Sequence, residues 1–489
     1  MSISRHATYN VMGAVIPLAV TVATVPLYLA LVGTDRYGVL ALCWAVLGYV
    51  GFLDLGLGPA IAQKIAAARD GPAADRARLF WTGTWMSLAL GAAGAAILYF
   101  ATHFYFEHAA NVGSVFRAEL RGALPLLALM VPMAMLASVF TGALQGMERF
   151  GIINLANGIG TTLMTLLPLA AAWFIAPDLP SLIGGALAAR ALTAALLLAA
   201  CIRSAKLGRP LGPSRDQIGP LLRFGGWVSV SSMAGPLLVT SDRLVIGAML
   251  SAAAVAVYAI PYNLVVRLAI IPSSLASAMF PRFAYADPEE RQRLIAAGAA
   301  AVAVIVTPAA IIGLGAVRPF FSLWIGETLA AQAAPVAVIL IVGAWANGFG
   351  QAPFVMMQAS GRPQVVSKLL LAEIIPYWAA LLGGIHLFGL LGAAAAWSLR
   401  AIVDTLLLFV VAEVRWSRLR FLAVPALLVA AGAVAATEIE GALGYAVIAG
   451  LAIASLVWSL FNMPDVLRSR LGAGATWLPR ARPAAGGRG

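Results

Sequence analysis

Apolar segments long enough to cross a lipid bilayer make up most of this sequence. A membrane helix needs roughly 20 apolar residues to span a hydrocarbon core about 30 Å thick. About fourteen such segments can be placed between glycine, proline and charged residues, near residues 10–33, 38–62, 79–102, 122–144, 151–175, 182–202, 222–249, 255–281, 295–317, 335–357, 367–386, 390–414, 421–439 and 442–462. Since 62% of the residues are hydrophobic and only 11% are charged, the chain cannot cover a water-soluble protein of this size with polar side chains. The sequence therefore predicts an all-α membrane protein with about 14 transmembrane helices and excludes a soluble enzyme.

The lysines and arginines lie mainly in alternate connections between these segments. The net charge of +12 would by itself suggest a nucleic-acid partner. With the N-terminus in the cytoplasm, however, 23 of the 32 Lys and Arg residues fall in cytoplasmic segments and four in segments on the other side. Because cytoplasmic loops accumulate Lys and Arg, the sequence predicts that both termini are cytoplasmic. This orientation accounts for the basic charge without nucleic acid.

Spans one to six and seven to twelve share landmarks, which indicates an internal duplication. Each set has a proline in its first helix, Pro17 and Pro236, and a tyrosine near the start of its second, Tyr37 and Tyr258. Because each half holds an even number of spans, we expect two six-helix bundles of the same orientation, related by a pseudo-two-fold axis along the membrane normal, plus two C-terminal helices. The expected boundaries are 1–202 for the first bundle, 203–221 for a cytoplasmic connector, 222–414 for the second bundle, 415–462 for the two extra helices and 463–489 for a flexible basic tail.

Arginines inside the apolar segments are the strongest functional signal. Arg190, Arg267 and Arg400 lie well inside spans, and Arg243 lies nearer a span end. An arginine at the centre of a membrane helix costs about 2.5–3.5 kcal/mol on insertion scales, so these side chains are expected to face a cavity or a partner. A guanidinium group can donate two parallel hydrogen bonds to a phosphate. The four arginines are therefore candidate ligands for an anionic substrate.

Pairing with acidic residues is the alternative interpretation of these arginines. The pairs to consider are Arg400 with Asp404, one helical turn later, and Arg190 or Arg267 with Asp54, Glu373 or Asp242. Asp54, Glu373 and Asp404 are also candidates for ion coupling, because ionisable residues within membrane helices can take part in proton relays. For Asp54, a structural role as an acceptor in the Gly-rich stretch 51–58 is the simpler interpretation.

Uncharged polar residues of the second half form a further candidate set, for contacts to sugar: Tyr262, Asn263, Asn347 and Gln351. Aromatic and amide groups suit ligands rich in hydroxyl groups, although polar residues also join membrane helices to one another. The four histidines are scattered and have no metal-ligand spacing, and the glycine-containing stretches lack a nucleotide-binding fingerprint. We therefore expect no metal, no cofactor and no catalytic residues.

A series of short motifs runs through the first twelve spans. They are Asn10 with Gly13, the turn GTDRYG at 33–38, LDLGLG at 53–58, LQGMERF at 144–150, SDRLVIG at 241–247 and LWIG at 323–326. In this order and spacing they resemble the polysaccharide transporter family, whose members include the Wzx-type flippases for lipid-linked O-antigen and exopolysaccharide repeat units. The wider superfamily also contains drug exporters and flippases for the cell-wall lipid precursor.

The resemblance implies a carrier in a bacterial inner membrane. Its expected activity is to move an undecaprenyl-pyrophosphate-linked oligosaccharide across the membrane by alternating access, through a central cavity that the arginines make cationic. The expected partners are that lipid, the surrounding membrane lipids and a polysaccharide polymerase or export machinery. A multidrug antiporter of the same superfamily is the alternative, and it would favour acids over arginines in its chamber. A membrane glycosyltransferase would need longer outer loops than residues 103–121.

Overall fold

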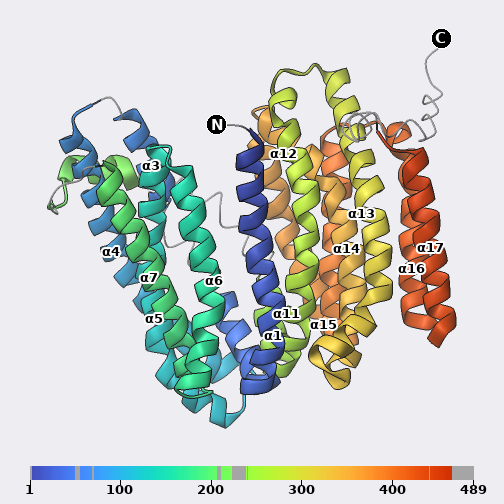
Figure 1. Cartoon of the computed structure of the whole chain (residues 1–489), viewed down its shortest axis with the longest axis horizontal. Coiled ribbons are helices and arrows are strands. Elements are labelled where there is room, and N and C mark those ends of the chain that lie inside the picture. The colour runs from blue at the N-terminus through green and yellow to red at the C-terminus, as the bar shows by residue number, and fades with distance from the viewer. Residues whose placement is uncertain are drawn as a thin grey trace. The chain divides into compact units, whose positions relative to one another are not determined.

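The computed structural model describes residues 3–49, 56–68, 71–205, 211–222, 238, 240–439 and 441–464. Throughout these ranges the chain is helical, with turns and short connections and without a single strand. Eleven of the described helices are long and apolar enough to cross a membrane (Figure 1). The prediction of an all-α, multi-span membrane protein is therefore confirmed.

Two long helical segments turn at a glycine that lies between consecutive expected spans. Helix α1 (Ile3–Leu47) turns at Gly33 (φ 79°, ψ 167°), and α15 (Pro363–Val411) turns at Gly389 (φ 56°, ψ −131°). Both turns need a positive φ, which glycine adopts without steric cost. The two arms of α15 then approach so closely that a Cβ on Gly392 would lie 1.8 Å from the carbonyl oxygen of Gly384. Of the expected span 222–249, the structure describes residues 222, 238 and 240–249.

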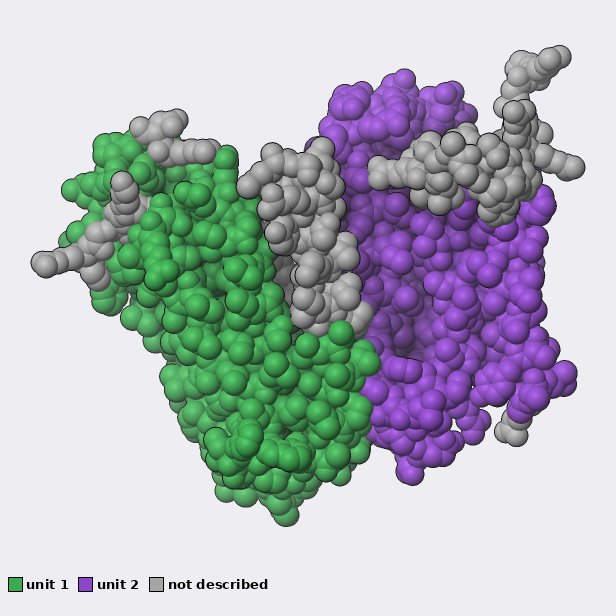
Figure 2. All heavy atoms as spheres, viewed as in Figure 1, with its two compact units in different colours: residues 1–256 green, residues 257–489 purple. Residues whose placement is uncertain are grey.

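The chain divides into two compact units, Met1–Ala256 and Val257–Gly489 (Figure 2). Besides α1, unit 1 contains α3 (Leu57–Ala67), α4 (Ala73–Phe104), η1 (Tyr105–Ala109), α5 (Ser114–Gly146), α6 (Phe150–Phe174), α7 (Leu179–Ala205) and α10 (Ser241–Met249). Helix α11 (Ala252–Val265) contains the boundary. Unit 2 continues with η2 (Val266–Ala269), α12 (Ile270–Tyr285), α13 (Pro288–Ile325), α14 (Glu327–Ala359), α15, η3 (Trp416–Leu422), α16 (Ala423–Glu438) and α17 (Gly441–Phe461).

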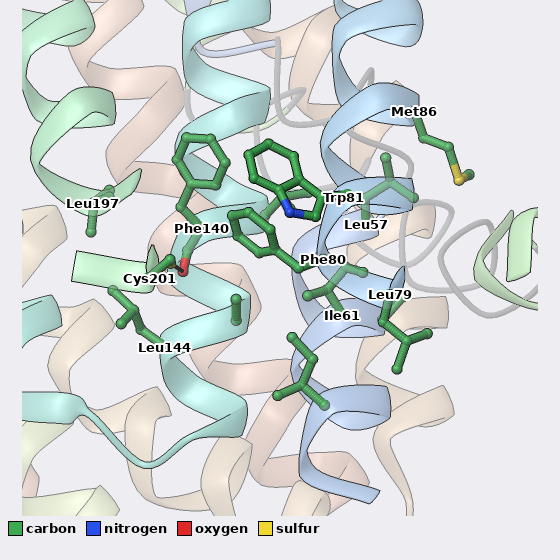
Figure 3. Close-up of a cluster of buried hydrophobic side chains, with 14 of the residues drawn as sticks. Leu57, Ile61, Leu79, Phe80, Trp81, Met86, Phe140, Leu144, Leu197 and Cys201 are labelled. Carbon is green, nitrogen blue, oxygen red and sulfur yellow. Dashed lines mark hydrogen bonds between the residues drawn. The ribbon is translucent and has the colours of Figure 1, made fainter. Parts of the chain in front are cut away.

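The core of unit 1 lies where α3, α4, α5 and α7 meet (Figure 3). Phe80 of α4 stacks on Phe140 of α5 with ring centroids 5.5 Å apart. The thiol of Cys201 on α7 donates to the carbonyl oxygen of Phe140 at 3.3 Å. These contacts join three helices through apolar side chains and one weak hydrogen bond, so Cys201 acts here as a small core residue.

Part of the predicted connector is attached to unit 1. The indole N–H of Trp85 donates to the carbonyl oxygen of Leu211 at 2.9 Å, and the backbone N–H of Ser214 donates to the hydroxyl of Thr82 at 3.0 Å. Helix α10 is held to the same unit, because the hydroxyl of Tyr105 donates to the carbonyl oxygen of Leu244 at 2.7 Å. The division into two six-helix bundles stays a prediction.

Hydrogen bonds between helices hold the centre of unit 2. The indole N–H of Trp345 on α14 donates to the hydroxyl of Thr307 on α13 at 3.0 Å. From the second arm of α15, the hydroxyls of Ser398 and Thr405 donate to carbonyl oxygens of α14, at 2.8 and 3.1 Å. The pair α16 and α17 packs against α13 (Figure 1). The two hydrogen bonds to α14 fix the second arm of α15, which carries Arg400.

Candidate functional site

Arg190 lies on α7 of unit 1 and is partly buried. Its Nε atom is buried without a hydrogen-bond partner, and no carboxylate of the described residues forms an ion pair with it. The pairing alternative for Arg190 therefore gains no support from that part of the chain. A partly buried guanidinium group that lacks a carboxylate is open to an anionic ligand.

Arg267 lies on a break in a membrane helix. The span Ala252–Tyr285 consists of α11 and α12, and the 3₁₀ turn η2 interrupts it at Val266–Ala269. Arg267 is exposed, and within the ranges that the structure describes it has no ion-pair partner. A stretch of 3₁₀ helix inside a long helix often marks a functional hinge. The 3₁₀ turn thus places a positive charge near the middle of the span, where the regular α-helix is interrupted.

The corresponding span of the first half is also interrupted. Helix α1 ends at Leu47, Gly48 and Tyr49 form a turn, and α3 begins at Leu57 after Gly56 with φ 61°. Under the predicted duplication this span is the counterpart of α11–α12. Interrupted helices at corresponding positions of two repeats are a pointer to a transport site. Asp54, a predicted coupling residue, falls between these helices and lies outside the described residues.

Arg400 forms an ion pair inside unit 2. Its Nη1 atom lies 3.4 Å from Oε2 of Glu373 on the other arm of α15, and the two side chains are 12% and 7% exposed. The guanidinium carbon lies 5.7 Å from the ring centroid of Tyr377, a cation–π contact. Asp404, one turn after Arg400, is a close neighbour of Glu373. The pairing alternative thus holds for Arg400 with Glu373, across the α15 hairpin.

Several polar atoms around this pair lack hydrogen-bond partners. They are Oε1 of Glu373, Nε of Arg400 and Nε1 of Trp397, each buried. Trp397 lies one turn before Arg400, and its ring meets that of Tyr262 edge-to-face with centroids 5.5 Å apart. Buried polar groups in proteins are usually hydrogen-bonded, so three unpartnered atoms on neighbouring residues are unusual.

The other predicted site residues occupy several places. Arg243 is the third residue of α10 in unit 1, and its backbone N–H donates to the buried carboxylate of Asp242 at 2.7 Å. Asn263 is exposed on α11, and Asn347 and Gln351 are partly buried on α14. The structure therefore brings together Tyr262, Glu373, Arg400 and Asp404 from the predicted set.

Tyr377 and Trp397 belong to the same group and were not predicted. A signal for them exists in the sequence, because Tyr377 follows Glu373 by four residues and Trp397 precedes Arg400 by three. These spacings place each aromatic ring on the helix face of its charged neighbour.

The family of this chain follows from its similarity to known proteins. A sequence profile described as "Polysaccharide biosynthesis protein" matches residues 3–286, which is more than half of the chain. The chain belongs to this family. A protein from Shigella flexneri named "Putative O-antigen transporter" is 28% identical to it over 409 residues, which cover 83% of this chain and 97% of that protein. The family resemblance inferred from the motifs is confirmed.

Solved structures of membrane transporters share the fold of this family member. The lipid II flippase MurJ in an inward closed conformation matches with a TM-score of 0.69 and 12% identity, covering 94% of this chain and 99% of that one. An inward-facing MATE family multidrug resistance transporter of the MOP superfamily matches with a TM-score of 0.65 and 15% identity, covering 82% and 97%. At these identities the likeness establishes the fold and leaves the substrate open.

Proposed function

We propose that this protein is a flippase that moves an undecaprenyl-pyrophosphate-linked oligosaccharide, such as an O-antigen or exopolysaccharide repeat unit, across a bacterial inner membrane. The observation that carries the proposal is that Arg190 in unit 1 and Arg267 in unit 2 lie within membrane helices without a carboxylate partner in the described chain. Their charge would be costly against lipid, and the phosphates of a lipid-linked sugar would compensate it. The names of the Shigella relative and of MurJ support the same class of cargo.

In this proposal the polyprenyl tail stays in the bilayer while the charged head passes through the protein by alternating access. The turn at Gly48 and Tyr49 and the 3₁₀ turn at Val266–Ala269 would act as hinges during this movement. Both termini are proposed to be cytoplasmic, which follows the distribution of Lys and Arg. A polymerase or export complex is the proposed acceptor of the translocated unit.

A multidrug antiporter is the second candidate, and one observation favours it. Glu373 and Asp404 together outnumber Arg400 in their cluster, and acids suit a cationic drug. In either carrier these two acids are the proposed ion-coupling residues among the described part of the chain. Arg190 and Arg267, which have no carboxylate partner among the described residues, favour the anionic cargo.

Proteoliposomes distinguish the two candidates. Undecaprenyl-pyrophosphate-linked oligosaccharide is placed in one leaflet, and its arrival in the other is followed with a sugar-specific lectin. Arg190→Ala and Arg267→Ala should each reduce the rate at least tenfold, whereas the matched control Arg282→Ala, which removes an exposed and ion-paired arginine, should not. Efflux of cationic dyes by the same vesicles, with no movement of the lipid, would replace the flippase by the antiporter.

A further inference from the structure

Five residues of α15 form a group that we call the α15 polar cluster: Glu373, Tyr377, Trp397, Arg400 and Asp404. The Gly389 turn folds α15 on itself and brings Glu373 of one arm within 3.4 Å of Arg400 of the other. Glu373, Tyr377 and Trp397 are buried, whereas Arg400 and Asp404 are partly exposed. The cluster is therefore mostly buried, and Arg400 and Asp404 are its accessible members.

The charges of the cluster disfavour a phosphate ligand. Two carboxyl groups lie near one guanidinium group, because Asp404 follows Arg400 by one helical turn and is a close neighbour of Glu373. A phosphate that took Arg400 would have to displace Glu373 and would leave two acids beside an anion in a largely buried place. Like charges at such short range repel strongly in a low-dielectric interior. Arg400 is therefore not equivalent to Arg190 and Arg267, for which no described carboxylate is a partner.

The unpartnered atoms of the cluster match a different kind of ligand. Oε1 of Glu373 is an acceptor, whereas Nε of Arg400 and Nε1 of Trp397 are donors. An ionised phosphate only accepts hydrogen bonds, so it cannot satisfy the glutamate. A sugar hydroxyl donates and accepts at once, and an acetamido group offers one donor and one acceptor. The ring of Tyr377 already holds the guanidinium group through its cation–π contact, so Arg400 would meet such a ligand in a fixed orientation.

We infer that the α15 polar cluster is a subsite for a hydroxyl- or acetamido-bearing sugar ring, and that the phosphates are bound elsewhere, by arginines without acidic partners. This inference rests on the proposed function, since it assigns the sugar part of the same lipid-linked cargo. It predicts that the cluster contributes to recognition of the glycan and not to affinity for the pyrophosphate. Trp397 and Glu373 are the residues that would determine specificity.

The experiment compares two probes that differ only in the sugar. Purified protein in nanodiscs is titrated with undecaprenyl pyrophosphate and with undecaprenyl pyrophosphate carrying one N-acetylhexosamine. Wild type should bind the sugar-bearing lipid more tightly, and Glu373→Gln should reduce that affinity roughly tenfold to a hundredfold, as expected for a lost hydrogen bond to a charged group. Affinity for undecaprenyl pyrophosphate itself should not fall, because Glu373 makes no contact with the phosphates in this inference. Trp397→Phe keeps an aromatic ring, removes one donor and should give a smaller loss of the same kind.

The outcomes separate this inference from the proposed function. Equal loss of both affinities in Glu373→Gln and Trp397→Phe would make the cluster structural and overturn the subsite. No loss of either would also overturn it, because water or a proton shared by Glu373 and Asp404 would then satisfy the unpartnered atoms. If wild type binds undecaprenyl pyrophosphate without any preference for the sugar, the subsite fails and the flippase stands. If wild type binds neither lipid, both fail.

Discussion

Replacing Arg400 with leucine should destabilise the protein by leaving Glu373 buried without its cation. The paired atoms lie 3.4 Å apart, and two unit charges at that distance interact by about 5 kcal/mol at an effective dielectric constant of roughly 20. Both side chains are nearly buried, so solvent screens them little, and breaking a buried pair by removing one partner costs roughly 3–5 kcal/mol. Because 3.4 Å is a long contact for a charged hydrogen bond, we expect a loss of about 3 kcal/mol.

The double variant tests the physical reason for that loss. Adding Glu373→Gln to Arg400→Leu removes the uncompensated charge and should restore most of the stability, since replacing both members of a buried pair is often close to neutral. The free energy of unfolding is measured by SDS titration in mixed micelles for wild type, both single variants and the double variant. If Arg400→Leu costs under about 1 kcal/mol, or if Glu373→Gln adds to the loss, the pair is not a buried charge pair and the reasoning fails.

Three further predictions concern packing, capping and transport. Gly392→Ala should prevent the close approach to Gly384 and strongly reduce the yield of folded protein in detergent. Gly383→Ala is the control and should be tolerated, because its new methyl group meets nothing within 4 Å. Equal yields of the two variants would contradict the contact between the arms. Asp287→Ala removes the side-chain cap of α13 and should lower the free energy of unfolding by about 1 kcal/mol, which SDS titration measures. Arg267→Ala should abolish flipping in proteoliposomes while membrane insertion, checked by fractionation, is unchanged; full transport would remove this residue from the site.

The fold class and family could be predicted from the sequence because they depend on local quantities. The length of an apolar run and the charge of its flanks determine whether a segment crosses the membrane, and neither depends on which helices touch. Two span boundaries could be placed for the same reason, because Gly33 and Gly389 interrupt the apolar runs where the chain turns with a positive φ.

The partner of Arg400 could not be chosen from the sequence alone. Asp404 lies one turn away on the same helix, whereas Glu373 is 27 residues away along the chain. The ion pair forms across the hairpin because Gly389 reverses the chain and Gly384 and Gly392 let the arms approach. Tyr377 and Trp397 were missed for the same reason, since their role depends on the two arms facing each other.

The arginines of this protein differ in how the cost of their charge inside the membrane is offset. The charge of Arg400 is compensated within the protein by Glu373. Arg400 therefore needs no anionic ligand and can donate hydrogen bonds to a neutral one. For Arg190 and Arg267 no described carboxylate offers such compensation, and a bound anion would offset their charge in the proposed function. Affinity for an anionic cargo should therefore depend on Arg190 and Arg267, and discrimination among cargoes on Arg400. A substitution that frees Arg400, such as Glu373→Gln together with Asp404→Asn, should consequently increase affinity for undecaprenyl pyrophosphate while weakening preference for its sugar.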